Sequence, residues 1–328
     1  MNILFRTAGG SAEGKQLGLG HIYRCINLAK NLQGHKIHFL IEDYGKGECI
    51  LRNNGFKKID ILSRNIKNSD DIKQTVSYVK EKNINIVIID KYRTKKSFVN
   101  KIRKNVKTVI ISDLKNIDYN VDLVVNGFIG FSNKIIKNKH GSKCLVGPNY
   151  QILSKDFQCS KKIRKKTQLL ATFGGFDEQK IGEKLISTLV KNQFNIKTKL
   201  ILGPSSSYHK KFLKKKSKLI KIIESTKNMQ KEMNESYFGI CSGGLTTYEF
   251  AVLDIPFAVV CQNRHQLITA KEWEKRKIGI NLGLVSKKTP SKIEKFIKMI
   301  QDNKIKPHNT KFVDGLAVNR ITKEILKL

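Results

Sequence analysis

The sequence predicts an α/β protein built from two doubly wound, Rossmann-like domains that face a shared cleft. Short apolar runs rich in β-branched residues alternate with longer segments of helical period through both halves of the chain, which favours β-α-β units and mainly parallel sheets. Glycine-rich loops follow several of these runs and come directly before a helical segment. The length of 328 residues is also typical of two domains, at ~100–200 residues each.

The first half follows this alternation from its start. Apolar residues at helical spacing predict helices between the expected strands. The expected strands span residues 3–6, 36–41, 59–62, 84–90, 108–112 and 123–126, and the expected helices span 22–32, 70–81 and 95–104.

The second half repeats the pattern. Strands are expected at residues 168–173, 198–202, 218–223, 237–241 and 257–261, and helices at 178–191, 228–234, 246–253 and 266–276. The highly charged stretch 161–166 is typical of a linker, so the domains are expected at residues 1–158 and 166–328. The last residues of the chain are expected to form a helix that packs on either domain.

Composition argues against several classes of protein. Apolar residues make up 40% of the chain, and no stretch approaches the ~20 apolar residues of a membrane-spanning helix. The first residues indicate a strand rather than a secretory signal, so we expect a cytoplasmic protein. The six cysteines, at positions 25, 49, 144, 159, 241 and 261, are irregularly spaced and have no histidine cluster beside them. This spacing argues against a disulfide framework or a zinc site, and we expect no metal and no cofactor.

The formal net charge of +36 at pH 7 is unusually high. Lysines run through the whole chain beside many isoleucines and asparagines, which is typical of a coding bias that leaves lysines on solvated faces. A nucleic-acid binder would gather the charge on one face, so no specific nucleic acid is expected. A peripheral contact with an anionic membrane stays open, with residues 161–166 and 210–216 as candidate patches. The oligomeric state is not indicated.

The first candidate site follows the first strand. Arg6 ends that strand, and Gly18-Leu19-Gly20-His21 then leads into a helix that also carries Arg24. A helix N-terminus offers free N–H groups and partial positive charge to an anion, and a histidine placed there can take a proton from water. The alternative is that His21 only caps the helix. The glycines are no dinucleotide fingerprint, because Tyr23 stands at the third glycine position.

Two glycine loops open helices in the second half. Gly174 and Gly175 follow a strand, where paired glycines either admit a nucleotide or simply make a turn. The stretch 241–249 is the stronger signal, because its glycines and hydroxyls can cradle a diphosphate at a helix N-terminus, although one of the hydroxyls could merely cap the helix. A glutamate one helical turn further on can accept two ribose hydroxyls. The nucleotide-binding residues expected from these loops are Gly174, Gly175, Ser242, Gly243, Gly244, Leu245, Thr246 and Glu249.

Polar residues follow other strands as well. Asn263 and Gln266 come after the strand at 257–261, where amides suit the hydroxyl or acetamido groups of a sugar. Asp90 and Tyr92 end another strand, and Ser112-Asp113 ends the next. The carboxyl ends of parallel strands share one edge of a sheet, so these groups are expected to face the ligand. A solvated loop is the alternative for each.

These motifs, in this order, resemble the nucleotide-sugar hydrolases of the pseudaminic acid pathway. That family is similar to the GT-B glycosyltransferases, and its second half is similar to the MurG-type carboxyl-terminal domain. The resemblance covers nearly the whole chain, through residues 4–6, 18–24, 89–92, 112–113, 145–153, 174–177, 242–249 and 263–266. Its most specific segment is Gly147-Pro148-Asn149-Tyr150-Gln151-Ile152-Leu153.

The resemblance implies a metal-independent hydrolysis of a UDP-linked 2,4-diacetamido-2,4,6-trideoxy sugar at C1. His21 would be the general base that activates water, residues 242–246 would hold the diphosphate, and Glu249 would hold the ribose. The expected partner is therefore a UDP-sugar substrate. The residues expected on the substrate side are Arg6, Gly20, Arg24, Asp90, Tyr92, Tyr150, Asn263 and Gln266.

The chain departs from the family pattern at three places. Ala8 stands where the family usually has an aspartate, the loop between Arg6 and Gly18 is longer, and Lys91 replaces a histidine. These departures touch the expected sugar side and spare His21 and the UDP side.

Three functions stay open at this point. The first is the hydrolase, with water as acceptor. The second is a GT-B glycosyltransferase that passes the sugar to a lipid or glycan acceptor at a membrane surface, which the basic charge would suit. The third is a non-catalytic protein that binds a nucleotide sugar or a nucleic acid.

Overall fold

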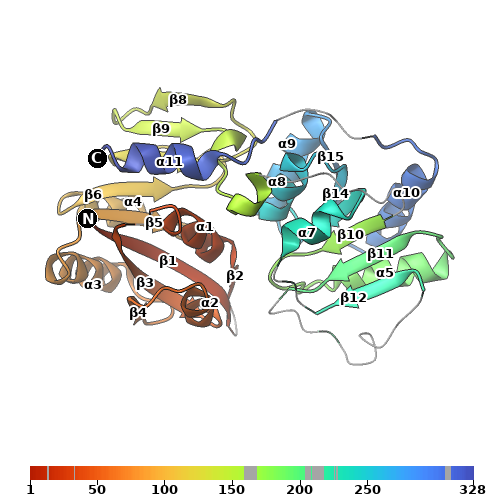
Figure 1. Cartoon of the computed structure of the whole chain (residues 1–328), viewed down its shortest axis with the longest axis horizontal. Coiled ribbons are helices and arrows are strands. Elements are labelled where there is room, and N and C mark those ends of the chain that lie inside the picture. The colour runs from red at the N-terminus through yellow and green to blue at the C-terminus, as the bar shows by residue number, and fades with distance from the viewer. Residues whose placement is uncertain are drawn as a thin grey trace. The chain divides into compact units, whose positions relative to one another are not determined.

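The structure, a computed structural model, describes residues 1–12, 15–32, 34–158, 168–203, 208, 218–224, 226, 228–306 and 312–328, without the side chains of residues 11, 12, 15 and 16. The chain divides into two compact units, Met1–Lys155 with Gly315–Leu328, and Asp156–Asp314 (Figure 1). Cys159, the expected linker at 161–166 and the basic run at 210–216 lie outside the described residues.

The first unit is built on a mainly parallel sheet. Its strands lie in the order β4-β3-β1-β5-β6-β7-β9-β8, with β8 antiparallel to β9 and β2 paired as an antiparallel hairpin to β1. Central strands such as β5 are buried along their whole length, which is why they read as continuous apolar runs. The strands are β1 Asn2–Ala12, β2 Lys15–Gly18, β3 Lys36–Tyr44, β4 Ile59–Leu62, β5 Ile86–Asp90, β6 Lys107–Ile111, β7 Leu123–Asn126, β8 Lys134–Lys137 and β9 Lys143–Val146.

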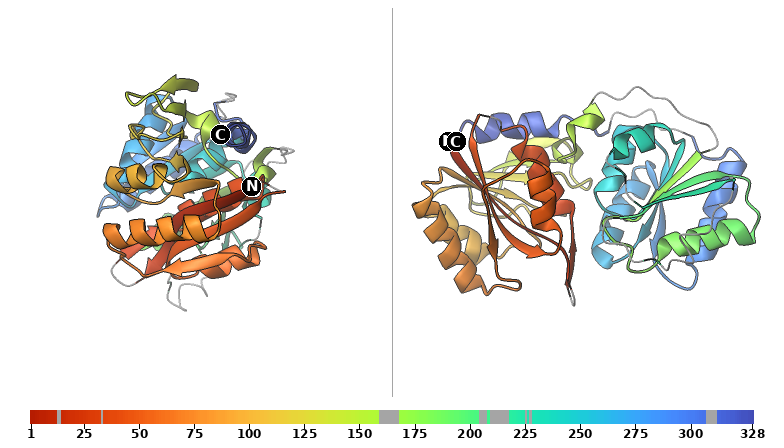
Figure 2. Two further views of the ribbon diagram at one scale, coloured as in Figure 1. Left: turned by 90° about the vertical axis from the view of Figure 1, so that its left-hand side faces the viewer. Right: turned by 60° about the horizontal axis from the view of Figure 1, so that its bottom comes forward.

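Helices cover both faces of this sheet (Figure 2). Successive side chains of a strand point to opposite faces. Ile3 and Phe5 therefore join the core under α1 and α11, whereas Leu4 joins the core under α3 and α4. The helices are α1 Gly20–Ala29, α2 Gly47–Asn53, α3 Asn68–Glu81, α4 Lys96–Arg103 and α11 Ala317–Ile325, with the 3₁₀ turn η1 Pro148–Tyr150. A second 3₁₀ turn, η2 Lys155–Gln158, begins at Lys155 and continues into the second unit.

The C-terminal helix α11 belongs to the first unit. Val318, Ile321 and Ile325 form one apolar stripe, and all three are buried in the core that also contains α1. Arg320 donates from Nη1 to the backbone oxygen of Asn149, 3.1 Å away. The sequence leaves open on which domain the last helix packs, and in the structure it packs on the first unit. The second unit therefore ends before residue 315, not at the expected residue 328.

The second unit has a parallel sheet in the order β12-β11-β10-β13-β14-β15. Its helices α5 and α10 pack on each other and share one core with the strands, and Trp273 of α9 packs edge-on against Tyr248 of α8. The elements are β10 Gln168–Thr172, α5 Ile181–Lys191, β11 Lys197–Ile201, β12 Ile220–Ile223, α7 Met229–Asn234, β13 Phe238–Cys241, α8 Leu245–Val252, β14 Phe257–Cys261, α9 Arg264–Lys275, β15 Gly279–Leu284 and α10 Thr289–Gln301.

Each sheet has a point at which the strand order reverses. In the first unit the chain leaves β1 toward β3 on one side and continues with β5 on the other, and Thr7 pairs with Asp90 across this junction. In the second unit the junction lies between β10 and β13, where Thr172 pairs with Cys241. Open α/β sheets bind their ligands at the carboxyl ends of the strands beside such a junction.

The expected α/β class and the expected strands and helices are confirmed, with shifts of a few residues at most ends. The first strand was expected to end at Arg6, but β1 continues to Ala12 and pairs with β2, so most of the expected loop between Arg6 and Gly18 is a β-hairpin. Among the α-helices and strands of the described residues, α2, α10, β2, β8, β9 and β15 were not anticipated. The helix α10 carries Ile293, Phe296, Ile297 and Ile300 on its buried face, a spacing that is visible in the sequence.

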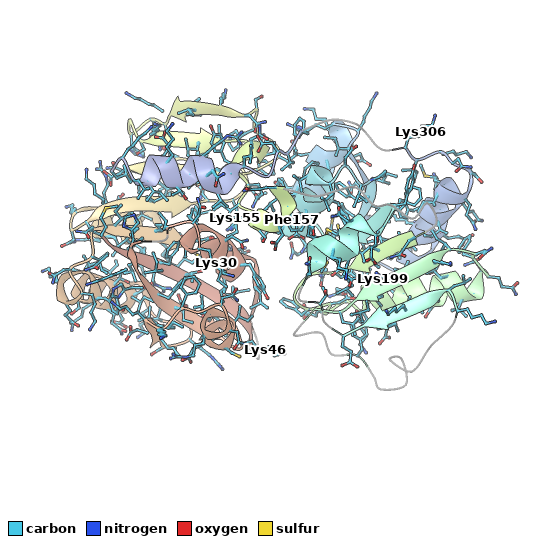
Figure 3. All side chains as sticks on the ribbon, in the orientation of Figure 1. Lys30, Lys46, Lys155, Phe157, Lys199 and Lys306 are labelled. Atoms are coloured by element: carbon cyan, nitrogen blue, oxygen red, sulfur yellow. The ribbon has the colours of Figure 1, made fainter. Side chains whose placement is uncertain are left out.

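Lysines are exposed on both units. Lys30 and Lys46 project from the first unit and Lys306 from the second (Figure 3). Lys199 is different, because its Nζ pairs with Glu232 and lies 3.0 Å from Oε2 of Glu235. Within the described residues, no helix has both the length and the apolar character needed to cross a bilayer.

Ile321→Ala should lower the free energy of unfolding by about 2–5 kcal/mol, because it leaves a cavity between α11 and the sheet. Leu326→Ala is the matched control, since Leu326 is 46% exposed whereas Ile321 is 0% exposed. Urea unfolding followed by circular dichroism measures both. Equal effects of the two substitutions would contradict the placement of α11.

Candidate active site

His21 and Asp90 meet at the strand-order junction of the first unit. The helix α1 begins at Gly20, and no side chain caps its N-terminus. Asp90 ends β5, and its side chain is completely buried. The Nδ1 atom of His21 lies 2.7 Å from Oδ1 of Asp90. A carboxylate only accepts hydrogen bonds, so when His21 donates its Nδ1 proton to Asp90 the lone pair of the neutral ring lies on Nε2. The Nη2 atom of Arg24, which can only donate, lies 2.9 Å from the same Nδ1.

Arg24 lies one turn further along α1 and binds the same carboxylate. Its Nε donates to Oδ2 of Asp90 at 3.0 Å, and its Nη2 donates to Oδ1 at 2.6 Å. Its Nη1 donates to Oδ1 of Asp113, which follows β6, at 2.6 Å. Burial alone would lower the pKa of Arg24, but the charges of Asp113 and Asp90 raise it well above its ordinary value. The guanidinium expected on the substrate side thus lies between two carboxylates of its own unit.

Two neutral groups complete the surroundings of Asp90. The hydroxyl of Thr7 donates to its backbone oxygen at 2.7 Å, which ties β1 to the end of β5. The thiol of Cys25 lies 3.9 Å from Oδ2. Burial and the charge of Asp90 raise the pKa of Cys25 well above its ordinary value, so this thiol stays protonated.

Arg6 lies on the opposite face of the sheet in a second buried ion-pair network. Its Nε donates to Oδ1 of Asp71 at 2.9 Å, and its Nη2 donates to Oε1 of Glu42 at 2.6 Å. Burial would raise the pKa of Asp71, but the Arg6 and Lys91 cations hold it below its ordinary value. Arg6 was expected to contact substrate, and the structure places it in the interior with its charge already paired.

Lys91 belongs to the same network. Its Nζ pairs with Asp71, lies 3.9 Å from Glu42 and sits over the ring of Phe98, 4.3 Å from the centroid. Burial and the neighbouring Arg6 charge lower its pKa. The side chain of Lys91 therefore points into the first unit.

The other expected residues of the first unit are Gly20, Tyr92 and Tyr150. Gly20 is the first residue of α1. Tyr92 is exposed, with the guanidinium of Arg93 5.1 Å from its ring centroid. Tyr150 ends η1 and packs against the core that contains α11. The structure thus brings His21, Arg24 and Asp90 together.

In the second unit, the loops after β10 and β13 meet at the strand-order junction. Gly174 has a φ of +86°, and a Cβ atom on it would lie 3.5 Å from Oγ of Ser242. Gly243 is packed so tightly against α9 that a Cβ atom would come within 2.8 Å of the backbone oxygen of Gln266. Gly244 faces open space, with no atom within 4 Å of the position of such a Cβ atom.

The N-terminus of α8 has no capping side chain and no acidic residue in its first turn. The first amide groups of a helix have no acceptor within the helix, so those of Leu245 and Thr246 can donate to an anion. The helix α9 differs, because the side chain of Asn263 caps it. The helix that follows the glycine loop, α8, is uncapped, as are α5 and α10 of the same unit.

Glu249 lies one turn into α8 and is partly buried. Burial raises its pKa to about 7, an increase that a hydrogen bond with Thr246 partly offsets. Among the described residues, no lysine or arginine forms an ion pair with it. Such a carboxylate is suited to accept hydrogen bonds from the hydroxyls of a ligand.

Asn263 and Gln266 form a capping arrangement at the start of α9. The Oδ1 atom of Asn263 accepts from the backbone N–H of Gln266 at 3.0 Å. The Oε1 atom of Gln266 accepts from the backbone N–H of Gln262 at 2.8 Å. Gln262 in turn donates from Nε2 to the backbone oxygen of Phe173 at 2.9 Å, which fixes the loop that leads to Gly174.

Asp113 was expected at the sheet edge that faces the ligand, and the structure pairs it with Arg24. Gln262 directly precedes Asn263 and holds the loop that leads to Gly174. Asp113 and Gln262 each follow a parallel strand that neighbours a strand of the site, β6 beside β5 and β14 beside β13. Their position just after a strand that neighbours the site is the sequence signal by which both residues can be found. In the part of the chain that the structure describes, no group of three or more His, Cys, Asp and Glu side chains is placed to hold a metal ion.

Solved structures define the fold of the whole chain. MurG of Acinetobacter baumannii aligns with 100% of this chain and 99% of its own, with a TM-score of 0.67 and 14% sequence identity. The S. aureus MnaA structure with UDP aligns with 99% of this chain and 96% of its own, with a TM-score of 0.66 and 12% identity. The chain therefore has a GT-B fold, as the resemblance implied.

Two curated proteins are similar in sequence. The uncharacterized protein MJ1062 of Methanocaldococcus jannaschii is 29% identical over 271 residues, which are 76% of this chain and 54% of that protein, so the chain spans about half of its length. The spore coat polysaccharide biosynthesis protein SpsG of Bacillus subtilis is 25% identical over 285 residues, 83% of this chain and 81% of that protein. No protein-family model matches the sequence.

Arg6→Ala should lower the free energy of unfolding by about 3–5 kcal/mol, because it leaves two carboxylates buried without their main cation. Arg52→Ala is the control, since Arg52 forms an exposed pair with Glu48 that is worth at most about 0.5 kcal/mol. Chemical denaturation measures both. A stable Arg6→Ala protein that has lost only substrate affinity would contradict the structural role of Arg6.

Proposed function

We propose that this chain is a nucleotide-sugar enzyme that hydrolyses a UDP-linked 2,4-diacetamido-2,4,6-trideoxyhexose at C1. It would release UDP and a free sugar for the biosynthesis of a pseudaminic-type nonulosonic acid. The observation that carries the proposal is the His21–Asp90 pair, which leaves an imidazole lone pair at the strand-order junction of a GT-B fold. SpsG, named for polysaccharide biosynthesis, and MnaA, solved with UDP, support a sugar nucleotide as substrate.

His21 acts as general base in this proposal. Its Nε2 takes a proton from water while the water oxygen bonds to C1 of the sugar. The bond between C1 and the phosphate oxygen breaks, and its electron pair leaves with UDP. Asp90 holds the ring through Nδ1 and stabilises the imidazolium that forms. A single displacement of this kind inverts the configuration at C1.

The second unit binds the nucleotide in this proposal. The amides of Leu245 and Thr246 and the hydroxyl of Ser242 hold the diphosphate at the uncapped end of α8, with Gly174, Gly175, Gly243 and Gly244 shaping the loops. The partial positive charge of the helix end stabilises the negative charge that develops on the departing UDP. This scheme requires no metal ion.

The remaining expected residues fall into two groups: those proposed to contact the ligand and those whose charge is already paired within the first unit. The oxygens of Asn263 and Gln266 already accept backbone hydrogen bonds, so we assign their NH₂ groups to the sugar or phosphate. Tyr92, Tyr150 and Gly20 remain proposed contacts on the sugar side. Arg6 and Arg24 take structural and positioning roles instead, because carboxylates of their own unit engage both cations.

A GT-B glycosyltransferase is the second candidate. The same imidazole could take the proton of an acceptor hydroxyl, and the match to MurG over the whole chain favours this reading equally. The high positive charge would then help a peripheral contact with an anionic membrane that carries the acceptor.

UDP release from a panel of UDP-diacetamido-trideoxyhexoses, with chelator and without acceptor, tests the proposal. Rapid release with equimolar free sugar is the expected result. Binding of UDP without release of sugar would favour the transferase. Release that stops on addition of chelator would contradict the metal-independent scheme.

His21→Asn should reduce kcat by about 10²–10⁴-fold, because it removes a positioned base, and should leave UDP affinity within about twofold. His140→Asn is the matched control, since His140 also pairs with an aspartate, Asp118 at 3.2 Å, on the surface of the same unit. Steady-state UDP release and calorimetric UDP binding measure the two effects. Full activity of His21→Asn would remove His21 from the mechanism.

UDP affinity should rise by about tenfold between pH 6 and pH 8, because the ribose binds the ionised form of Glu249, whose pKa is about 7 without ligand. Below pH 7 a proton must leave the carboxyl before it can accept two hydroxyls, so binding weakens as pH falls. Calorimetric titrations of UDP across this range measure the effect.

The UDP phosphate itself titrates in the same range, so Glu249→Gln supplies the baseline. This substitution should flatten the pH dependence to that of UDP and weaken binding by about 10–100-fold at pH 8. Glu272→Gln, which alters a half-buried helical pair with Arg276 on α9, should leave both unchanged. An unchanged profile for Glu249→Gln would exclude the ribose contact.

A further inference from the structure

The only tryptophan of the chain is hydrogen-bonded to α8, the helix that follows the glycine loop of the second unit. Trp273 of α9 is fully buried, and its ring centroid lies 5.0 Å from that of Tyr248 and 5.6 Å from that of Phe257. Its indole Nε1 donates to Oγ1 of Thr247, also fully buried, at 3.0 Å. An indole N–H can only donate, so the hydroxyl of Thr247 is the acceptor of this bond.

The hydroxyl of Thr247 donates in turn to the glycine loop. Its proton goes to the backbone oxygen of Gly244, 2.8 Å away, and the backbone N–H of Thr247 donates to the same oxygen at 3.2 Å. A carbonyl oxygen can only accept, so the direction of this chain of hydrogen bonds is fixed: from indole to hydroxyl to carbonyl. Each bond in such a chain polarises and strengthens the next, above all where water is excluded.

The peptide group between Gly244 and Leu245 stands at the end of this chain. In a trans peptide the C=O and N–H bonds point in opposite directions, so a hydrogen bond at the oxygen polarises the group and makes the N–H a better donor. Gly244 has no side chain that could hold the peptide by packing. The two hydrogen bonds to its oxygen therefore fix the direction in which the Leu245 N–H points.

We propose that Trp273 and Thr247 are positioning residues for the diphosphate, which orient and polarise the amide of Leu245. The inference rests on the proposed function, in which that amide holds the diphosphate of UDP. Both side chains are completely buried, so they act through the oxygen of Gly244. A buried indole N–H also needs an acceptor for stability alone, so the test has to separate diphosphate binding from folding.

The ratio of UDP affinity to uridine affinity isolates the contribution of the diphosphate. Thr247→Val keeps the shape of the side chain and removes the hydroxyl, whereas Thr247→Ser keeps the hydroxyl. Thr188→Val is the matched control, because Thr188 is a buried residue of α5 in the same unit whose hydroxyl donates to the backbone oxygen of Lys184 at 2.7 Å. Calorimetric titration measures both affinities, and thermal unfolding measures the stability of each variant.

Thr247→Val should lower the ratio of the two affinities by about tenfold, because the diphosphate then meets a weaker and less well oriented donor. Uridine affinity should stay within about twofold of wild type, and Thr247→Ser should retain the wild-type ratio. Thr188→Val should lower the melting temperature and leave the ratio unchanged. An unchanged ratio in Thr247→Val, or an equal fall in Thr188→Val, overturns the inference.

Trp273→Phe tests the first bond of the chain, since it removes the indole donor and keeps an aromatic ring. It should lower the ratio about threefold in the wild-type background and have no further effect on the ratio in Thr247→Val, because Trp273 acts through Thr247. Equal effects in the two backgrounds overturn the role of Trp273. If Thr247→Val does not fold, an unchanged ratio in Trp273→Phe is the result that overturns the inference.

The outcomes for this inference and for the proposed function are distinct. A wild-type protein that binds UDP but releases it from no sugar nucleotide overturns the proposed hydrolysis, and the affinity ratios still decide the roles of Thr247 and Trp273. An active hydrolase with an unchanged ratio in Thr247→Val overturns the inference alone. A wild-type protein that binds UDP no more tightly than uridine also overturns the inference, because no diphosphate is then held at α8.

Discussion

A carboxylate with no exposed surface has to be neutralised by groups that the fold brings to it, and Asp90 is such a carboxylate. It ends the central strand β5, opposite Thr7 of β1, so the parallel pairing of these two strands fixes its position. The helix α1, which follows the hairpin of β1 and β2, supplies both His21 and Arg24. The register of one strand pair thus determines which residues meet at the candidate active site.

The candidate sites of the two units have the same architecture but contain different chemical groups. In each, a helix without a capping side chain starts at the carboxyl edge of the sheet, α1 beside the β1–β5 junction and α8 beside the β10–β13 junction. The first junction gathers ionisable side chains suited to move a proton. The second gathers backbone amides, hydroxyls and one partly buried carboxylate, which suit a nucleotide. This division explains why the expected base and the expected nucleotide contacts fall in separate halves of the sequence.

The sequence predicts most of the strands and the glycine loops, because buried parallel strands and strand-to-helix turns leave strong local signals. Residues that act through distant partners are harder to predict. Arg6 has the position of a ligand-binding residue, but its partners Asp71 and Glu42 are remote in sequence and lie on the opposite face from His21. Asp113 and Arg24 are separated by 89 positions, so only the neighbouring placement of β5 and β6 reveals their pairing. The apolar stripe of the C-terminal helix is visible in the sequence, but it does not show whether the helix packs on the core of the first or of the second unit.

The resemblance leads to the expectation of a histidine at position 91, and the lysine found there is accommodated in the interior of the first unit. Its cation joins the interior network of Arg6, Asp71 and Glu42 and packs over Phe98. The substitution therefore changes the support beneath the end of β5 rather than adding a charge beside His21.

The most direct test of the central claim is a single-turnover reaction in ¹⁸O-labelled water, with the UDP and the sugar analysed by mass spectrometry immediately after quenching. If His21 activates water for attack on C1, the label enters the sugar and none enters the phosphate of UDP. Label in UDP would place the attack at phosphorus, and release of UDP only when an acceptor is added would make the protein a transferase; either result would contradict the account.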